Sequence, residues 1–157
     1  MPPAGKRARD DRKGSPPASS RPAAGYSGTP LWKKLGYAPG TRALAVDAPG
    51  GYARLLSLPP EVKVSWLGRP ERGLRFVHVF AKESTSLQGE LARLRREIVP
   101  DGVVWVSWPK RASGVPTDIT EDTIREIAIP LGFVDIKVCA VDKTWSGLKL
   151  MIRRTER

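Results

Sequence analysis

The chain has 157 residues, a formal net charge of +11 and a single cysteine, Cys139. This length suits one domain with a sizeable core and is too short for two ordinary domains. Apolar residues make up 40% of the chain, which excludes a wholly disordered protein. The lone cysteine excludes an internal disulfide framework and any zinc site built from several thiolates. Because no apolar run approaches the ~20 residues of a membrane span and no secretory signal opens the chain, we expect a cytoplasmic protein with no membrane partner.

The first 28 residues differ in composition from the rest. They are rich in Pro, Gly, Ala and Ser, and their six basic and two acidic residues leave a charge of +4. Such a segment buries too little apolar surface to offset its ordering entropy, so we expect residues 1–28 to form a disordered basic tail. Its default role is that of a solubilising segment, and contact with nucleic acid or an acidic partner is the alternative. Residues 29–157 then form a single domain with a charge of +7.

Strand and helix patterns alternate along this domain. Leu87, Leu91, Leu94 and Ile98 recur at helical spacing and predict one long amphipathic helix. The predicted helices span 29–36, 52–58, 84–99 and 120–129. The predicted strands span 42–47, 62–67, 74–81, 103–108, 134–142 and 148–154. Residues 100–102 (Pro-Asp-Gly) are predicted to form a turn, and Asp118 or Thr120 to cap the last helix.

This order of elements predicts an α/β fold: a Rossmann-like, mostly parallel sheet of about six strands flanked by helices. The short, Gly-containing connection at residues 143–147 predicts an antiparallel hairpin at the C-terminus. That ending resembles the class I methyltransferase fold, in which the last strand runs antiparallel. Compared with that fold, the chain lacks one helix–strand–helix stretch after its second strand. The exposed edge of the hairpin makes a homodimer one hypothesis for its assembly.

Four segments resemble a bacterial family known only as domain of unknown function 3052. They are residues 29–37, 105–114, 120–126 and 138–147. The resemblance extends over roughly residues 29–155, and the long Trp-containing segments are its most specific part. It implies no activity, because none is established for that family.

A ligand site is expected outside the carboxyl ends of the parallel strands. Three predicted loops lie there, at residues 47–52, 109–114 and 142–147, and each mixes glycine with polar or aromatic side chains. We expect the three loops to converge on one edge of the sheet. The candidate ligand-binding residues are Asp47, Gly50, Gly51, Trp108, Lys110, Arg111, Ser113 and Trp145.

An S-adenosylmethionine site in the methyltransferase-like fold has a Gly-rich loop after the first strand and an acid at the end of the second. Residues 47–51 keep an acid and two glycines, but Pro49 has no N–H to donate. The second predicted strand leads into residues 68–70 without an acid, and Arg69 suits a phosphate better than ribose hydroxyls. The resemblance therefore predicts a cofactor site with several of its features lost.

Catalytic groups are sparse in the sequence. His78 is the only histidine and lies among Phe76, Val77, Val79 and Phe80, so we expect it to be a hydrogen-bonded core residue. Cys139 lies between Val138 and Ala140 and is expected to be a buried, inert thiol. No catalytic residue and no metal site is therefore predicted.

Three functions are compatible with these features. The first is a non-catalytic binding module for a small anionic or aromatic ligand, with Lys110 and Arg111 holding the charge and Trp108 or Trp145 stacking on a ring. The second is nucleic-acid binding through the basic surface and tail, for which net charge is the warrant. The third is a reduced S-adenosylmethionine-dependent methyltransferase. The first predicts no cofactor, and the third predicts binding of S-adenosylmethionine.

Overall fold

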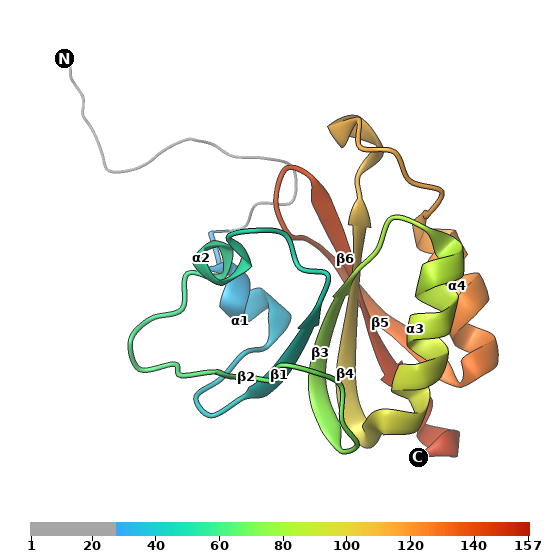
Figure 1. The fold of residues 1–157 in the computed structure, drawn as a ribbon, viewed down its shortest axis with the longest axis horizontal. Coiled ribbons are helices and arrows are strands. Elements are labelled where there is room, and N and C mark those ends of the chain that lie inside the picture. Colours follow the sequence, from blue (N-terminus) through green and yellow to red (C-terminus); the bar gives the residue numbers. More distant parts are fainter. Residues whose placement is uncertain (1–27) are drawn as a thin grey trace.

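The computed structural model describes residues 28–157, which form a mixed six-stranded sheet with helices on both faces (Figure 1). Of the tail predicted at residues 1–28, all but Gly28 lies outside the described residues. The strands are β1 (Arg42–Val46), β2 (Ser65–Trp66), β3 (Leu74–Phe80), β4 (Ile98–Pro109), β5 (Phe133–Ala140) and β6 (Trp145–Ile152). The α-helices are α1 (Leu31–Leu35), α2 (Tyr52–Leu56), α3 (Ser84–Glu97) and α4 (Glu121–Ala128). Short 3₁₀ turns are η1 (Arg111–Ser113), η2 (Ile129–Leu131) and η3 (Arg154–Glu156).

The sheet order is β2-β1-β3-β4-β6-β5. The first four strands run parallel, whereas β6 lies antiparallel between β4 and β5. The predicted α/β, Rossmann-like architecture with a C-terminal antiparallel hairpin is confirmed. Because β5 and β4 both run antiparallel to β6, the hairpin after β5 opens at the same sheet edge as the end of β4.

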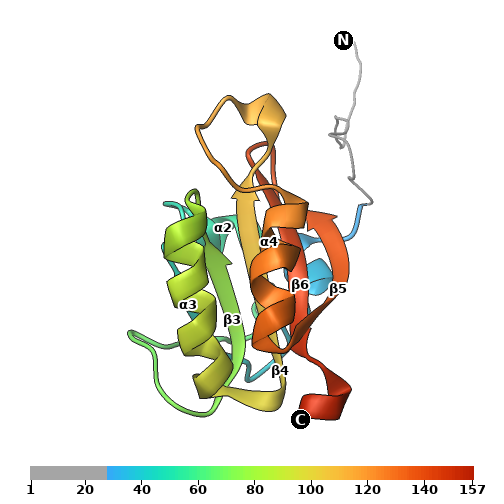
Figure 2. The same cartoon turned by 90° about the vertical axis from the view of Figure 1, so that its right-hand side faces the viewer.

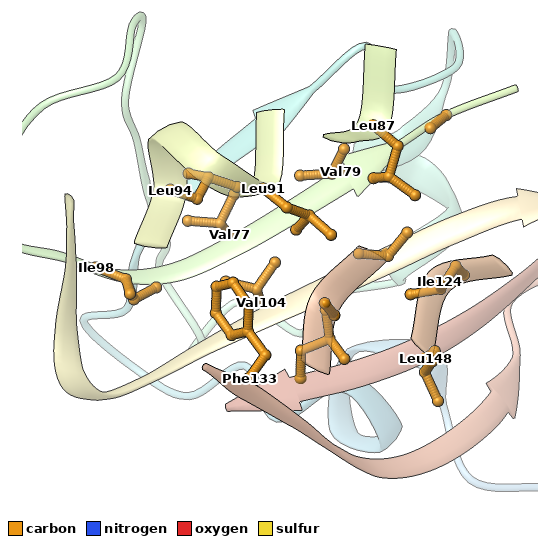
Figure 3. Close-up of a cluster of buried hydrophobic side chains, with 14 of the residues drawn as sticks. Val77, Val79, Leu87, Leu91, Leu94, Ile98, Val104, Ile124, Phe133 and Leu148 are labelled. Carbon is orange, nitrogen blue, oxygen red and sulfur yellow. The ribbon is translucent and has the colours of Figure 1, made fainter. Parts of the chain in front are cut away.

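Two apolar clusters hold helices to the sheet. On one face, α3 and α4 cover the sheet, and Leu91, Leu94 and Ile124 interlock with Val104 and Phe133 (Figure 3). These five side chains are fully buried, and the helical spacing of the two leucines is the pattern that predicted α3. On the other face, the shorter α1 and α2 pack over the first strands (Figure 1).

Two local predictions about the strands differ from the structure. Strand β2 is only Ser65–Trp66, shorter than the predicted 62–67, because it is an edge strand followed at once by the loop at Gly68. The predicted turn at 100–102 instead lies inside β4, which starts directly after α3. Leu74 of β3 pairs with Ile98 and Phe76 pairs with Val103. The residues of β4 between Ile98 and Val103 therefore form a bulge-like irregularity in the β3–β4 ladder.

Of the two residues predicted as alternative caps of α4, the structure selects Thr120 and not Asp118. Thr120 caps α4, and its hydroxyl accepts a hydrogen bond from the backbone N–H of Thr123. Asp118 has a different role, because its carboxylate accepts from both the backbone N–H and the hydroxyl of Ser84 at the start of α3, at 2.8 and 2.9 Å. A capping side chain can thus come from a segment distant in sequence, which local spacing does not reveal.

The irregular part of β4 gives a first testable prediction. A Cβ at Gly102 would lie 2.4 Å from Cγ1 of the buried Ile98 and 3.2 Å from the carbonyl oxygen of Val99. Gly102→Ala is therefore expected to lower the free energy of unfolding by about 1–3 kcal/mol, as overpacking does in well-packed cores. Gly89→Ala, in the exposed middle of α3 with no atom within 4 Å of the new Cβ, is the matched control and should stabilise by about 0.5–1 kcal/mol. Urea unfolding of both variants checks this, and equal effects would contradict it.

Candidate functional site

A cavity of about 420 Å³ opens at the sheet edge between the carboxyl ends of β1 and β3. The chain leaves β1 toward β2 on one side and then crosses to β3 on the other, so this is the topological switch point of the sheet. In open α/β sheets, ligands bind at this point because the loops of adjacent strands diverge there and leave a crevice. The volume lies within the ~300–1,000 Å³ typical of small-molecule sites.

The cavity wall comes from four parts of the chain. These are the end of β1 with its following loop, the end of β3, the first half of α3 and the start of β6. The lining residues are Val46, Asp47, Pro49, Val79, Phe80, Ala81, Lys82, Glu83, Ser86, Leu87, Glu90 and Trp145. The mixture of apolar walls with a few charged groups is typical of ligand sites.

Asp47 ends β1 in an unusual backbone conformation, with φ of 55° in the left-handed region. Aspartate tolerates this region better than most residues, but the conformation still costs energy and often marks functional sites. This conformation turns the chain from β1 into the loop that leads to Gly51. Gly51 is the N-cap residue of α2 and also has a positive φ, of 85°. The Asp47 side chain forms no hydrogen bond or ion pair with any residue of 28–157. An uncommitted carboxylate therefore stands at the cavity wall.

The other charged groups at the cavity come from the β3–α3 connection and α3. Glu83 and Lys82 adjoin the end of β3, and Glu90 lies two turns into α3, where it pairs with Arg93. Arg93 is shared with Glu97, so Asp47, Glu83 and Glu90 together outnumber Lys82. The cavity thus favours a ligand with positive charge.

Hydrogen bonds from the segment before α4 hold the β3–α3 connection in place. The Thr117 hydroxyl donates to the carbonyl of Lys82 at 2.7 Å, and Asp118 holds the first turn of α3 as described above. These bonds fix the backbone that presents Lys82, Glu83 and Ser86 to the cavity.

Two aromatic side chains border the cavity on the side of α1 and α2. Phe80 and Trp145 meet edge to face, with ring centroids 5.1 Å apart and planes at 88°. The hairpin that carries Trp145 is shaped by Asp142, whose carboxylate accepts from the backbone N–H groups of Thr144 and Trp145, both at 2.8 Å. Aromatic faces attract cations, which agrees with the charge of the cavity.

Beneath the site lies a chain of buried polar groups. The Tyr37 hydroxyl bonds the Tyr52 hydroxyl at 2.8 Å, Tyr52 bonds Nδ1 of His78 at 2.6 Å, and Nε2 of His78 bonds the Ser107 hydroxyl at 2.7 Å. Burial lowers the pKa of His78 to about 3 and raises the pKa of both tyrosines far above the usual value. His78 is therefore a neutral, hydrogen-bonded core residue, as predicted. Because Tyr52 begins α2, this chain also anchors the helix that follows the Asp47 loop.

The three predicted loops all lie at the carboxyl edge of the sheet (Figure 1), and the N–H of Lys110 donates to the carbonyl of Thr144 at 2.7 Å. The predicted residues are nevertheless divided. Asp47 and Trp145 line the cavity. The residues that do not line it are Gly50, Gly51, Trp108, Lys110, Arg111 and Ser113.

Their places in the fold explain the division. Gly50 and Gly51 lie further along the β1 loop, and Trp108 is buried in the cluster under α3 and α4. Lys110 and Arg111 stand at the start of the η1 turn, and Arg111 is exposed. The anionic-ligand role of these two side chains stays a prediction.

Sequence reasoning missed the residues from Val79 to Glu83 and the α3 residues. The signal was present, because residues 81–83 also follow a parallel strand and include two charged side chains. The same rule that selected the other three loops applies to this one.

Cys139 is half-buried, less than the full burial predicted, and burial raises its pKa. In the described part of the chain, no three His, Cys, Asp or Glu side chains gather so as to hold a metal ion. None of the helices within residues 28–157 is both long and apolar enough to cross a bilayer.

Comparison with solved structures shows what the fold is similar to. A SAM-dependent methyltransferase from Aquifex aeolicus aligns with a TM-score of 0.59 and 18% identity over 78% of this chain and 87% of its own. N-methyltransferase NodS from Bradyrhizobium japonicum, in complex with S-adenosyl-L-homocysteine, aligns at 0.51 and 11% identity over 77% and 83%. A TehB-like SAM-dependent methyltransferase from Corynebacterium glutamicum aligns at 0.50 and 11% identity over 79% and 88%.

No protein-family model matches the chain, and no curated protein sequence matches it. The likeness therefore lies in the fold. Six strands in this order, with the last antiparallel, give the chain the Rossmann-like fold of the S-adenosylmethionine-dependent methyltransferases.

Proposed function

We propose that this protein binds S-adenosylmethionine in the cavity at the switch point. The observation that carries the proposal is the position of Asp47, an uncommitted carboxylate in a left-handed conformation at the wall of that cavity. The likeness to methyltransferases supports the choice of ligand. When bound, S-adenosylmethionine supplies a methyl group activated by a positive sulfonium.

The chemistry of the wall fits such a ligand in two respects. The excess of Asp47 and Glu83 over Lys82 complements the net positive charge of S-adenosylmethionine, whose sulfonium and ammonium groups outnumber its one carboxylate. Phe80 and Trp145 offer aromatic surface beside which a sulfonium is stabilised. This charge favours S-adenosylmethionine over the anionic ligand expected from the sequence.

Strand β2 does not contribute to the wall of the cavity. Strand β2 pairs with β1 only at the level of Arg42 and Ala43, well below the cavity at Val46 and Asp47. Its end therefore does not reach the cavity, residues 67–70 after it contain no acid, and the next acid, Glu71, pairs with Arg42. We infer that the ribose is held without the carboxylate that the resemblance leads one to expect.

Asp47→Asn tests the proposal. Loss of a charge-assisted hydrogen bond of about 1.5–3 kcal/mol should weaken binding of S-adenosylmethionine about 10- to 100-fold in isothermal titration calorimetry of the full chain. Asp101→Asn is the matched control, since its carboxylate is 70% exposed and its pair with Arg75 is a surface one. S-adenosyl-L-homocysteine, which lacks the sulfonium charge, should bind more weakly than S-adenosylmethionine.

Two results would refute the proposal. The first is no heat and no thermal shift with millimolar S-adenosylmethionine. The second is equal affinity of the Asp47→Asn and Asp101→Asn variants, which would place the ligand away from the switch point. Methyl transfer is a separate step, tested by release of S-adenosyl-L-homocysteine once binding is established.

We also propose that the chain belongs to the family of domain of unknown function 3052. The four similar segments support this, and in the structure they form α1, the end of β4 with η1, α4, and the β5–β6 hairpin. An alignment of homologues tests it: the Trp-containing segments at 105–114 and 138–147 should recur together.

A further inference from the structure

A strip of the sheet on the side of α1 and α2 is left uncovered. Those helices pack over the first strands, β4 and the start of β6, where Trp145 is buried, whereas further along this face the side chains of β5 and the end of β6 are only partly buried or exposed. Val134 and Lys137 of β5 lie here beside Lys149 and Met151 of β6, as the pairing of the two strands shows. Figure 2 shows the β5–β6 hairpin at one side of the sheet, with α1 behind it.

Three lysines gather on this strip. Lys137 and Lys149 are direct partners across the antiparallel β5–β6 pair, so their side chains stand next to each other on one face. Lys34 reaches the same region from α1, since the charges of Lys34 and Lys137 both act on the thiol of Cys139 and lower its pKa against the effect of burial. We call Lys34, Lys137 and Lys149 the lysine face.

The position of α1 beside these strands is fixed by a buried side chain. The indole N–H of Trp105 donates to the carbonyl of Leu35 at 2.8 Å, and Trp105 is also the partner of Lys149 across β4–β6. The last turn of α1, with Lys34, is thus held close to Lys149.

Among the described residues, no acidic side chain pairs with the lysine face. Within residues 28–157, none of the three lysines forms an ion pair. Burial lowers the pKa of Lys149, and the nearby charge of Lys137 lowers it further. Like charges directly opposite on neighbouring strands destabilise a sheet, and a bound anion relieves that repulsion.

We propose that the lysine face binds the phosphate backbone of nucleic acid. Several positive charges without acidic partners suit a polyanion whose charges are closely spaced. The segment that leads into α1, residues 1–27, adds six basic side chains against two acidic ones, and it joins the domain at the helix that carries Lys34.

The test uses the full chain and three proteins: wild type, Lys34→Gln/Lys137→Gln/Lys149→Gln, and a control with the same loss of charge, Lys63→Gln/Arg72→Gln/Lys143→Gln. The control residues are exposed and, among the described residues, form no ion pair. Fluorescence anisotropy with a 20-nucleotide oligothymidylate and with a random-sequence duplex is recorded over a series of salt concentrations. Circular dichroism confirms that each variant is folded.

The lysine-face variant should bind about 10- to 100-fold more weakly at 0.1 M salt, and the slope of log K against log salt should fall by about 2 for the single strand. The control should change far less. Equal losses in both variants would mean diffuse attraction to net charge and would overturn the proposal. So would absence of binding at low salt, or binding of wild type to phosphatidylserine vesicles alone. If instead the lysines only protect the edge strand, the lysine-face variant would self-associate while binding DNA as before.

Discussion

Trp105→Ala is expected to lower the free energy of unfolding by about 4–5 kcal/mol, the upper end of the range for deleting a buried Trp. Trp105 heads the largest fully buried side chains, with 0% exposure, and it lies in the cluster between the sheet and α1. Its removal leaves a large void and also takes the hydrogen-bond donor from the carbonyl of Leu35. Urea unfolding followed by far-ultraviolet circular dichroism measures the effect without relying on tryptophan fluorescence.

Two further variants keep this prediction testable if the alanine variant does not fold. Trp105→Phe retains most of the apolar contact and loses the indole N–H, so it should cost about 1–2 kcal/mol. Trp66→Ala removes a Trp that is 42% exposed and should cost less than half as much as Trp105→Ala. Similar losses at positions 66 and 105 would show that burial on the α1 side of the sheet does not control stability.

The second large effect is acid destabilisation through His78. Burial lowers the pKa of His78 to about 3 in the folded state, whereas its ordinary value is 6.5. Below pH 6.5 the unfolded chain binds a proton that the folded protein does not, so this contribution to stability is complete above pH 6.5 and is lost as the pH falls toward 3. Between pH 6.5 and 4.5 the loss should be about 2–3 kcal/mol, at ~1.4 kcal/mol for each pH unit.

Carboxyl groups also titrate in this range, so the control is a variant that differs only at His78. His78→Gln keeps an amide donor and acceptor between Tyr52 and Ser107, and its stability should depend less on pH by the stated amount. His78 is the only histidine in the chain, so its ring resonances in the untagged protein also report its pKa directly. A titration midpoint near 6.5 in the folded protein would contradict the prediction.

Much of the fold was predictable because periodicity and turn chemistry are local. The spacing of the leucines in α3 and the apolar runs of β3 and β4 predict that these side chains are buried. Gly36 ends α1 with a φ of 98°, the left-handed conformation expected of a C-cap glycine. The length of β2 was not predictable, because only pairing with β1 decides how many of residues 62–67 join the sheet. The prediction of a turn at 100–102 was wrong for the same reason, because pairing with β3 keeps Pro-Asp-Gly inside strand β4.

The site was predictable in part. The rule that ligands bind at strand carboxyl ends led to Asp47 and Trp145, which line the cavity. It also led to Lys110 and Arg111, whose loop lies at that edge but next to β4, beyond the switch point, and whose role in ligand binding stays a prediction. The strands that flank the crevice are determined by the order of strands in the sheet. Local sequence patterns do not predict that order.

The amino-acid sequence by itself determined the alternation of strands and helices, the closing hairpin and the buried state of His78, since each follows from residue types near one another in the chain. The tertiary structure alone decided three other features. These are the position of the cavity between β1 and β3, the hydrogen bonds from Asp118 to the start of α3, and the pairing of Lys137 with Lys149 near Lys34. Each of these joins segments far apart in sequence, and such contacts depend on how the sheet is assembled and on its register.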